Sequence, residues 1–128
     1  MTERGNLVSR TVERALRPLF PAHLAHEVCL AATALSVDAR DSDPDVAAIL
    51  AASGALMCSD IPWYGPVGAC RVARSKEEWI VNPPPTDYDA AELSLLLAGT
   101  DEGVITLEAQ GKEVRNVVGG VHVYGCEP

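Results

Sequence analysis

One segment in the middle of the chain constrains the fold most, because it predicts a helix that is apolar around most of its circumference. Asp43-Pro44-Asp45 places a capping carboxylate before a proline at the first helical position, with another acidic residue in the first turn. The residues from Pro44 to about Cys58 are then nearly all alanine, leucine, isoleucine, valine and methionine. A helix of this composition has to be heavily buried, and we expect it to pack between a sheet and another protein surface.

The segments before this helix predict one further helix and one strand. Apolar side chains recur at helical spacing over residues 6–17, where Asn6 is placed to cap the helix and Pro18 and Pro21 end it. From Glu27 to Val37 the chain is apolar almost throughout and contains no breaker. Such a run is typical of an interior strand covered on both faces, so we place it at the centre of a sheet.

The C-terminal half of the chain predicts two antiparallel hairpins. Strands are expected over residues 67–74 and 78–82, joined by a polar turn. The three prolines at positions 83–85 forbid regular structure, and strands over Leu93–Gly99 and Val104–Glu108 form the second hairpin. We expect no element beyond it. Together with the helices, this order predicts a single α/β (α+β) domain.

Composition and charge limit the classes of function. With 128 residues, of which 48% are hydrophobic and 22% charged, the chain has the length and composition of one packed domain. Its formal net charge of −8 argues against a surface that binds nucleic acid over its whole extent, because phosphate neutralisation needs clustered lysine and arginine. Any contact with RNA must therefore be local, and DNA is not an expected partner.

Metal, redox and membrane sites are not expected either. The cysteines lack CxxC spacing and the histidines lack HxxxH or HExxH spacing, so we interpret them as buried free thiols and as surface or interface histidines. The chain has no run of about 18 apolar residues, and its first residues are too polar for a secretory signal. The residues concerned are Cys29, Cys58, Cys70, Cys126, His23, His26 and His122.

Three arginines of the first predicted helix are candidates for contacts with RNA phosphates. Arg10, Arg14 and Arg17 recur at i, i+4 and i+7, so their guanidinium groups share one helix face and can form a ladder for RNA phosphates. In the alternative interpretation, Arg10 or Arg14 pairs with Glu13 or another surface acid. Arg17 can also satisfy carbonyl groups at the end of the helix.

Two other pairs of residues have both a structural and a functional interpretation. Arg71 and Arg74 lie in a predicted strand, where a solvated or intersubunit position is favoured over contact with RNA. Trp63 and Tyr64 lie in a loop expected at residues 59–66, where packing against the sheet is favoured over stacking on a base.

Several short motifs follow one another along the chain, beginning with Arg-Thr-Val-Glu-Arg-Ala-Leu-Arg-Pro-Leu-Phe-Pro at residues 10–21. Over residues 7–113 the series resembles the first of the two RNase PH-like cores of polynucleotide phosphorylases, also called polyribonucleotide nucleotidyltransferases. The Ser-Asp-Ile-Pro-Trp form of the loop is most similar to plant-type organellar members. The other motifs are His26-Glu27-Val28, Leu35-Ser36-Val37-Asp38, Asp43-Pro44-Asp45, Ala55-Leu56-Met57, the loop from Ser59 to Gly68, Val81-Asn82-Pro83 and Leu97-Ala98-Gly99-Thr100.

The resemblance implies an RNase PH-like, ribosomal protein S5 domain 2-like fold with a mixed sheet and packed helices, incomplete at the N-terminus. Residues 1–113 would be a partial first core and residues 114–128 a divergent tail. The implied activity is 3′-to-5′ phosphorolytic degradation and processing of RNA, by a full enzyme that uses Mg²⁺ and inorganic phosphate. The implied partners are RNA, the second core and the other subunits of a trimeric ring, in an organelle (chloroplast or mitochondrion) or in the bacterial cytoplasm.

The resemblance also implies that this segment is not the catalytic one. In the second core of the family a serine-rich turn binds phosphate at a helix N-terminus, whereas the two carboxylates at residues 43–45 would repel phosphate. Asp87, Asp89 and Glu92 lie in the region of the catalytic acids, where a solvated acidic turn is favoured over Mg²⁺ binding. We therefore assign no catalytic residue, metal ligand or cofactor. We expect scaffolding and RNA guidance from a chain that is inactive alone.

Two alternatives remain at this point. A standalone, non-catalytic RNase PH-like subunit of a larger ribonucleoprotein assembly would carry the same motifs. An unrelated α/β binding domain would require the ordered matches to be coincidental.

Overall fold

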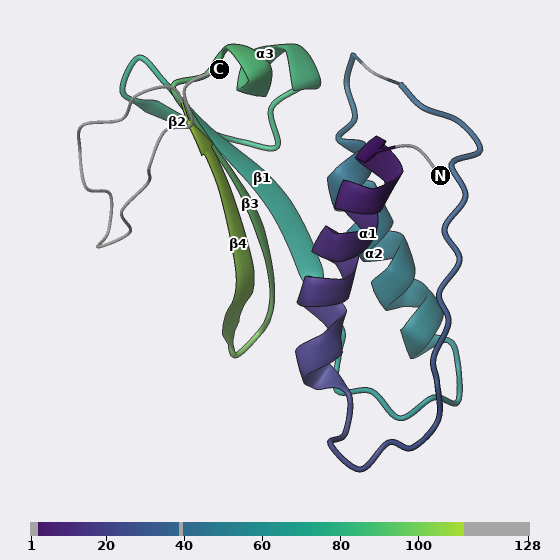
Figure 1. Ribbon diagram of the computed structural model, residues 1–128. Helices are drawn as coiled ribbons and strands as arrows, with labels where there is room; N and C mark the ends of the chain where they lie inside the picture. The colour runs from purple at the N-terminus through teal and green to yellow at the C-terminus, as the bar shows by residue number, and fades with distance from the viewer. Residues whose placement is uncertain (1–2, 39, 112–128) are drawn as a thin grey trace.

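Two helices lie side by side against a four-stranded sheet in the computed structural model, which describes residues 3–38 and 40–111 (Figure 1). A third, short helix connects the two hairpins of the sheet. The elements are, in chain order, α1 (Glu3–Leu16), the 3₁₀ turn η1 (Arg17–Leu19), α2 (Pro44–Met57), β1 (Gly68–Ser75), β2 (Glu78–Val81), α3 (Pro85–Ala90), β3 (Leu93–Thr100) and β4 (Gly103–Gly111).

The sheet consists of two hairpins that meet between β1 and β3, in the order β2-β1-β3-β4. Val72 of β1 lies opposite Val81 of β2 on one side and Leu95 of β3 on the other. Lys76 and Glu77 link β1 to β2 with φ angles of 50° and 70°, the backbone of a two-residue turn whose twist suits a hairpin. Both predicted hairpins are confirmed. The sheet is antiparallel throughout the described residues, whereas the prediction was a mixed sheet.

The predicted apolar helix is confirmed as α2, although only one of its faces is buried. Asp43 caps the helix, because its Oδ1 accepts a hydrogen bond from the backbone N–H of Asp45 at 3.0 Å. Ile49 is fully buried on the inner face, whereas Leu50 and Met57 on the outer face are about half exposed. The outer face is left open within the described chain, so the expected packing of this face against another protein surface stays a prediction.

The first helix begins earlier than predicted and ends close to the predicted residue. α1 starts at Glu3, so Asn6 lies inside the helix and does not cap it. The α-helix stops at Leu16 and continues as the tighter turn η1. Pro18 accounts for this change, because proline lacks the N–H that the regular helical ladder requires.

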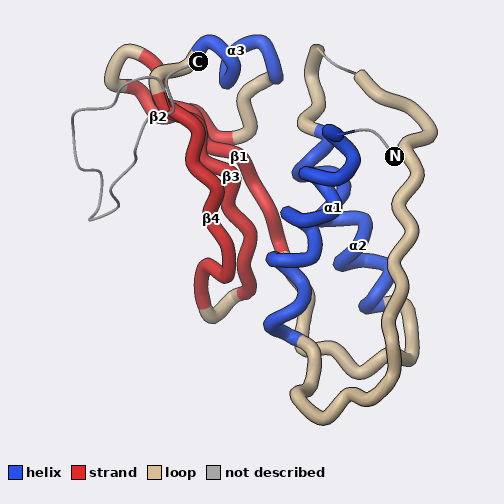
Figure 2. The backbone as a smooth tube through the Cα atoms, in the orientation of Figure 1, coloured by secondary structure: helices blue, strands red, loops and turns tan. Residues whose placement is uncertain are grey.

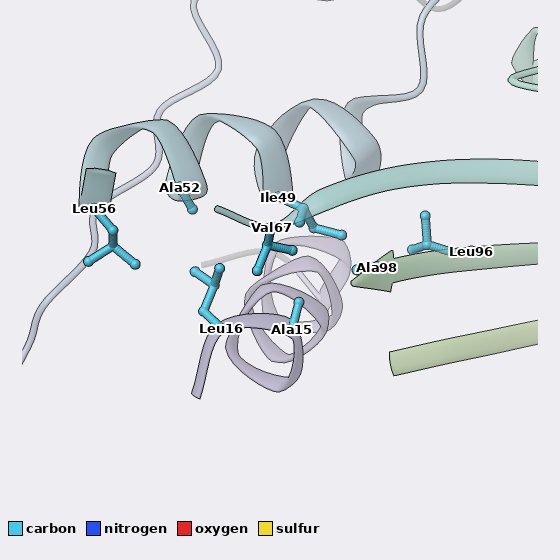
Figure 3. Close-up of a cluster of buried hydrophobic side chains, with 8 residues drawn as sticks. All are labelled: Ala15, Leu16, Ile49, Ala52, Leu56, Val67, Leu96 and Ala98. Atoms are coloured by element: carbon cyan, nitrogen blue, oxygen red, sulfur yellow. The ribbon is translucent and has the colours of Figure 1, made fainter. Parts of the chain in front are cut away.

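A hydrophobic cluster joins both helices to the sheet, and its side chains point toward one another in Figure 3. Trp63 packs against this cluster, with its Nε1 donating to the backbone oxygen of Leu16 at 3.1 Å. The prediction for the loop at residues 59–66 was packing against the sheet; Trp63 does pack on the domain, next to Leu16 and Phe20 after α1, whereas Tyr64 is exposed. The cluster consists of Ala15, Leu16, Ile49, Ala52, Leu56, Val67, Leu96 and Ala98.

The prediction of a central strand at Glu27–Val37 is wrong. The described part of the chain between η1 and α2 is a loop along its whole length (Figure 2). From Cys29 to Val37 its apolar residues are exposed, with Leu35 at 95%, whereas Val28 packs against the core. The physical reason is that β1 and β3, at the centre of the sheet, each have a strand partner on both sides. The centre of the sheet therefore has no free position for this segment.

Two smaller expectations also fail. The prolines at positions 83–85 do not exclude regular structure, because Pro85 is the first residue of α3, where a proline is well tolerated. The cysteines are not buried, since Cys29 and Cys58 are exposed and Cys70 is partly exposed. Cys126 lies outside the described residues.

Truncation of one side chain in α2 tests the assignment of its inner face. We expect Ile49→Ala to lower the free energy of unfolding by about 2–5 kcal/mol, because it removes buried methyl groups and leaves a cavity. Leu50→Ala is the matched control in the same helix, and a loss of less than about 1 kcal/mol is expected from its half-exposed position. Urea denaturation measures both, and equal losses would contradict the assigned face.

Candidate functional site

The centre of the candidate site is an arginine buried between a helix and the sheet. Arg71 of β1 is only 7% exposed. Its Nε donates to Asp43 Oδ2, its Nη2 donates to Asp45 Oδ2 at 3.2 Å, and its Nη1 donates to Ser94 Oγ of β3 at 3.3 Å. The prediction of a solvated or intersubunit position for Arg71 is wrong, because the carboxylates at the start of α2 hold its charge inside the domain.

Residues that follow β2 complete the surroundings of Arg71. Its guanidinium carbon lies 4.3 Å from the centre of the Tyr88 ring, a distance suited to a cation–π contact. The backbone of Arg71 is paired with Asn82, whose Oδ1 accepts from the Arg71 N–H at 3.1 Å. The N–H of Asn82 in turn donates to the Arg71 carbonyl at 2.7 Å. One residue thus connects the start of α2 with β1, β3 and α3.

Burial changes the acidity of two groups in this cluster. Burial raises the pKa of Asp45, and the nearby negative charge of Asp43 raises it further, against the opposing effect of Arg71. The Oδ1 of Asp45 is buried without a hydrogen-bond partner, which agrees with this direction. Burial likewise raises the pKa of Tyr88, with Asp43 as the next cause. The cluster therefore carries an excess of negative charge that costs stability when Asp45 is ionised.

A groove of about 640 Å³ separates α1 from β4 next to this cluster. Thr11 and Glu108 bridge the groove, since Thr11 Oγ1 lies 2.9 Å from Glu108 Oε1. The same Glu108 oxygen accepts from Arg14 Nη1 at 3.5 Å. Arg10 and Arg14 line the groove from the helix side, together with Arg4. The groove thus has a basic wall along α1 and one acidic group on β4.

The structure separates the three arginines that the sequence places on one helix face. Arg10 and Arg14 line the groove, whereas Arg17 does not line it and pairs with Glu13 at 2.6 Å. The alternative in which Arg10 or Arg14 pairs with Glu13 or another surface acid holds for Arg14, which pairs with Glu108, whereas the partner of Glu13 is Arg17. Sequence reasoning did not identify Arg4, because the helix was expected to begin after it.

The other candidates do not gather into a metal site in the part of the chain that the structure describes. No three His, Cys, Asp or Glu side chains converge there closely enough to hold a metal ion, so Asp87, Asp89 and Glu92 do not provide the ligand set that Mg²⁺ requires. Arg74 lies over the ring of Trp79 at 5.9 Å.

His23 and His26 are exposed, and His122 lies outside the described residues. Over residues 3–38 and 40–111, none of the helices has the length and apolar character needed to span a membrane.

Comparison with known proteins identifies the fold family. The profile of the 3′ exoribonuclease family, domain 1 (RNase PH), matches residues 1–62. The chain carries an RNase PH family domain. Polyribonucleotide nucleotidyltransferases are similar to it over most of its length: the protein of Acidiphilium cryptum is 42% identical over 113 residues, that of Synechococcus sp. 46% over 112 and that of Aquifex aeolicus 42% over 113.

These matches cover 88% of this chain but only 14–16% of each relative, so the chain spans a small part of the length of these proteins. The expected RNase PH-like fold class is confirmed, and so is the resemblance to polyribonucleotide nucleotidyltransferases. The exoribonuclease part of the resemblance rests on the family model that matches residues 1–62. The alternative of an unrelated α/β binding domain is therefore wrong.

Removal of the buried guanidinium tests how the cluster is held together. We expect Arg71→Ala to lower the free energy of unfolding by about 3–5 kcal/mol, because Asp43 and Asp45 would then be left without their partner. Arg74→Ala, in the same strand, is the control and is expected to cost about 1 kcal/mol or less, since it removes one cation–π contact at most. Thermal or urea unfolding measures the difference, and similar losses for both variants would refute a special role for Arg71.

The raised pKa of Asp45 predicts a pH dependence with a definite sign. A carboxyl group with a folded-state pKa above its ordinary value of 3.8 binds its proton more tightly in the folded protein, so the wild type gains stability as pH falls toward 3.8. Asp45→Asn removes this titration. The stability of the wild type relative to Asp45→Asn should therefore rise from neutral pH toward pH 4, as measured by urea denaturation.

Asp101→Asn, in the exposed turn between β3 and β4, controls for the loss of one distant surface carboxylate. A wild type that loses stability relative to Asp45→Asn as pH falls would show the opposite sign and contradict the assignment.

Proposed function

We propose that this chain is a scaffolding and RNA-guiding segment of a polyribonucleotide nucleotidyltransferase, and that its own residues do not perform the phosphorolysis. The full protein would degrade and process RNA from the 3′ end with inorganic phosphate. In this proposal residues 1–113 belong to the first of two RNase PH-like cores, and residues 114–128 form a divergent tail. The similarity to enzymes of this name over most of the chain supports the family part of the proposal.

The observation that carries the non-catalytic part is the closed N-terminus of α2. A helix N-terminus binds phosphate when its N–H groups are free and its surroundings are not negative. Here Pro44 has no N–H, the N–H of Asp45 donates to Asp43, and both carboxylates are held by Arg71. An anion would have to displace two carboxylates from a buried arginine to reach this helix end.

The residues present also do not fit a catalytic metal site. The acidic residues after β2 do not converge, and their region contains the short helix α3. We therefore propose that Mg²⁺ and the phosphate substrate are bound elsewhere in the full protein, by the second core. No step of the reaction is assigned to side chains of this chain.

Exposed apolar side chains support partners that cover this segment. Four large apolar side chains are about half exposed or more: Leu35, Val37, Leu50 and Met57. Exposed apolar patches mark interaction surfaces. We propose the second core and the other subunits of a trimeric ring as the partners. The relatives compared above come from bacteria, which favours the bacterial over the organellar setting.

The basic wall of the α1 groove supports RNA guidance. Arg10 and Arg14 lie together on one side of the groove, so two phosphates can be bound locally although the chain as a whole carries a charge of −8. We propose that these two arginines contact RNA.

A second candidate function is a standalone, non-catalytic subunit of a larger ribonucleoprotein assembly. The same exposed apolar residues favour this second function, because another subunit of the assembly could cover them as well as a second core could. Mass measurement of the complex isolated from its source separates the two: a longer two-core polypeptide supports the phosphorylase segment, and a chain of 13.6 kDa among other subunits supports the standalone subunit.

An activity assay tests the absence of catalysis directly. The purified chain, incubated with RNA, Mg²⁺ and inorganic phosphate, should release no nucleoside diphosphates above background, because α2 offers no phosphate site. The native complex from the source serves as the positive control. Phosphorolysis by the purified chain at a rate comparable with that complex would overturn the proposal.

A further inference from the structure

The groove between α1 and β4 is faced by one arginine of α1 that the sequence did not indicate. Arg4 lines the groove with Arg10 and Arg14, whereas Arg17 does not. At a rise of 1.5 Å per residue, the three side chains are distributed over about 15 Å of the helix. We propose that Arg4, Arg10 and Arg14 form a path for the phosphates of single-stranded RNA, with Arg4 as an additional contact and Arg17 outside it. This inference rests on the proposed RNA guidance and assigns its residues.

The ion pairs of the described residues favour Arg4 and Arg10 as phosphate ligands. Neither of them forms an ion pair within residues 3–38 and 40–111. Their guanidinium donors are therefore available to a phosphate, which they match in geometry. Arg17, by contrast, forms a short i,i+4 pair with Glu13.

The contact of Arg14 with Glu108 is weak enough to be exchanged. The two atoms are 3.5 Å apart, and both side chains are at least a third exposed. Exposed ion pairs of this kind contribute little to stability because water competes with them. An RNA phosphate can therefore replace Glu108 at Arg14 without a loss of core packing.

Arg4 lies where the groove meets a second cavity of about 670 Å³. Tyr88 and Asp89 line that second cavity but not the groove, and the carboxylate of Asp89 makes the cavity less favourable to an anion, whereas Asp45 and Arg71 line both. The phosphate path would therefore end at Arg4. A purely structural role for Arg4 is the competing explanation. The positive charge of Arg4 lowers the pKa of Asp45, whereas burial raises it.

The test measures binding of a labelled single-stranded oligoadenylate to the full 128-residue chain over a range of salt concentrations. Arg4→Gln should weaken binding about fivefold at moderate salt, the contribution of one exposed ion pair. It should also reduce the slope of log K against log salt by about 0.7, the value for one lost phosphate contact on a single strand. Arg17→Gln is the matched control on the same helix and should change neither quantity.

Each outcome decides between specific alternatives. If Arg10→Gln and Arg14→Gln weaken binding but Arg4→Gln changes only stability, Arg4 is structural, and the inference fails while the proposed RNA guidance survives. If none of these variants alters binding, the RNA guidance itself fails. An effect of Arg17→Gln equal to that of Arg4→Gln would overturn the assignment of the groove.

Two competitors identify the ligand chemistry. Inorganic phosphate at matched ionic strength should not displace the oligonucleotide, and displacement would reassign the groove to free phosphate. Binding of poly-glutamate with the same dependence on Arg4, in the absence of RNA binding, would reassign it to an acidic protein partner. Circular dichroism of each variant verifies that the chain remains folded.

Discussion

The buried charge of Arg71 is the constraint on which the arrangement of the domain depends. A guanidinium group is tolerated inside a protein only when its charge and its donors are matched. Here α2 supplies Asp43 and Asp45, β3 supplies Ser94 and α3 supplies the ring of Tyr88. The position of α2 relative to the sheet follows from these contacts. The same contacts occupy the helix end that would otherwise suit an anion, so one arginine determines both the packing and the proposed lack of catalysis.

The elements that sequence reasoning predicted well have signals within a few residues of themselves. Asp43 and Pro44 mark the start of α2 because a side-chain cap and a fixed φ angle act locally. The two hairpins are equally local, since in each a two-residue turn joins strands that pair with one another. The ordered motifs identified the family fold without a view of the structure, because they cover most of the chain.

Features that depend on distant parts of the chain were not predictable. The apolar run at Glu27–Val37 indicates a need for burial, but it carries no information on whether a strand position is available. Arg71 was assigned to the surface because its partner Asp43 is 28 residues away. Arg4 was missed for a local reason: Asn6 is a good capping residue, and placing the helix start there left Arg4 outside the helix.

The hydrogen bond between Thr11 and Glu108 has a consequence for the order in which the domain assembles. It connects residues that are 97 positions apart, whereas each hairpin closes over a turn of two residues. A contact between residues far apart in the sequence costs more loop entropy than a hairpin turn, so it forms later. The groove between α1 and β4 has its two walls at opposite ends of the described chain. It is therefore complete only when both ends have come together, and a nascent or partly unfolded chain presents the arginines of α1 without the opposite wall.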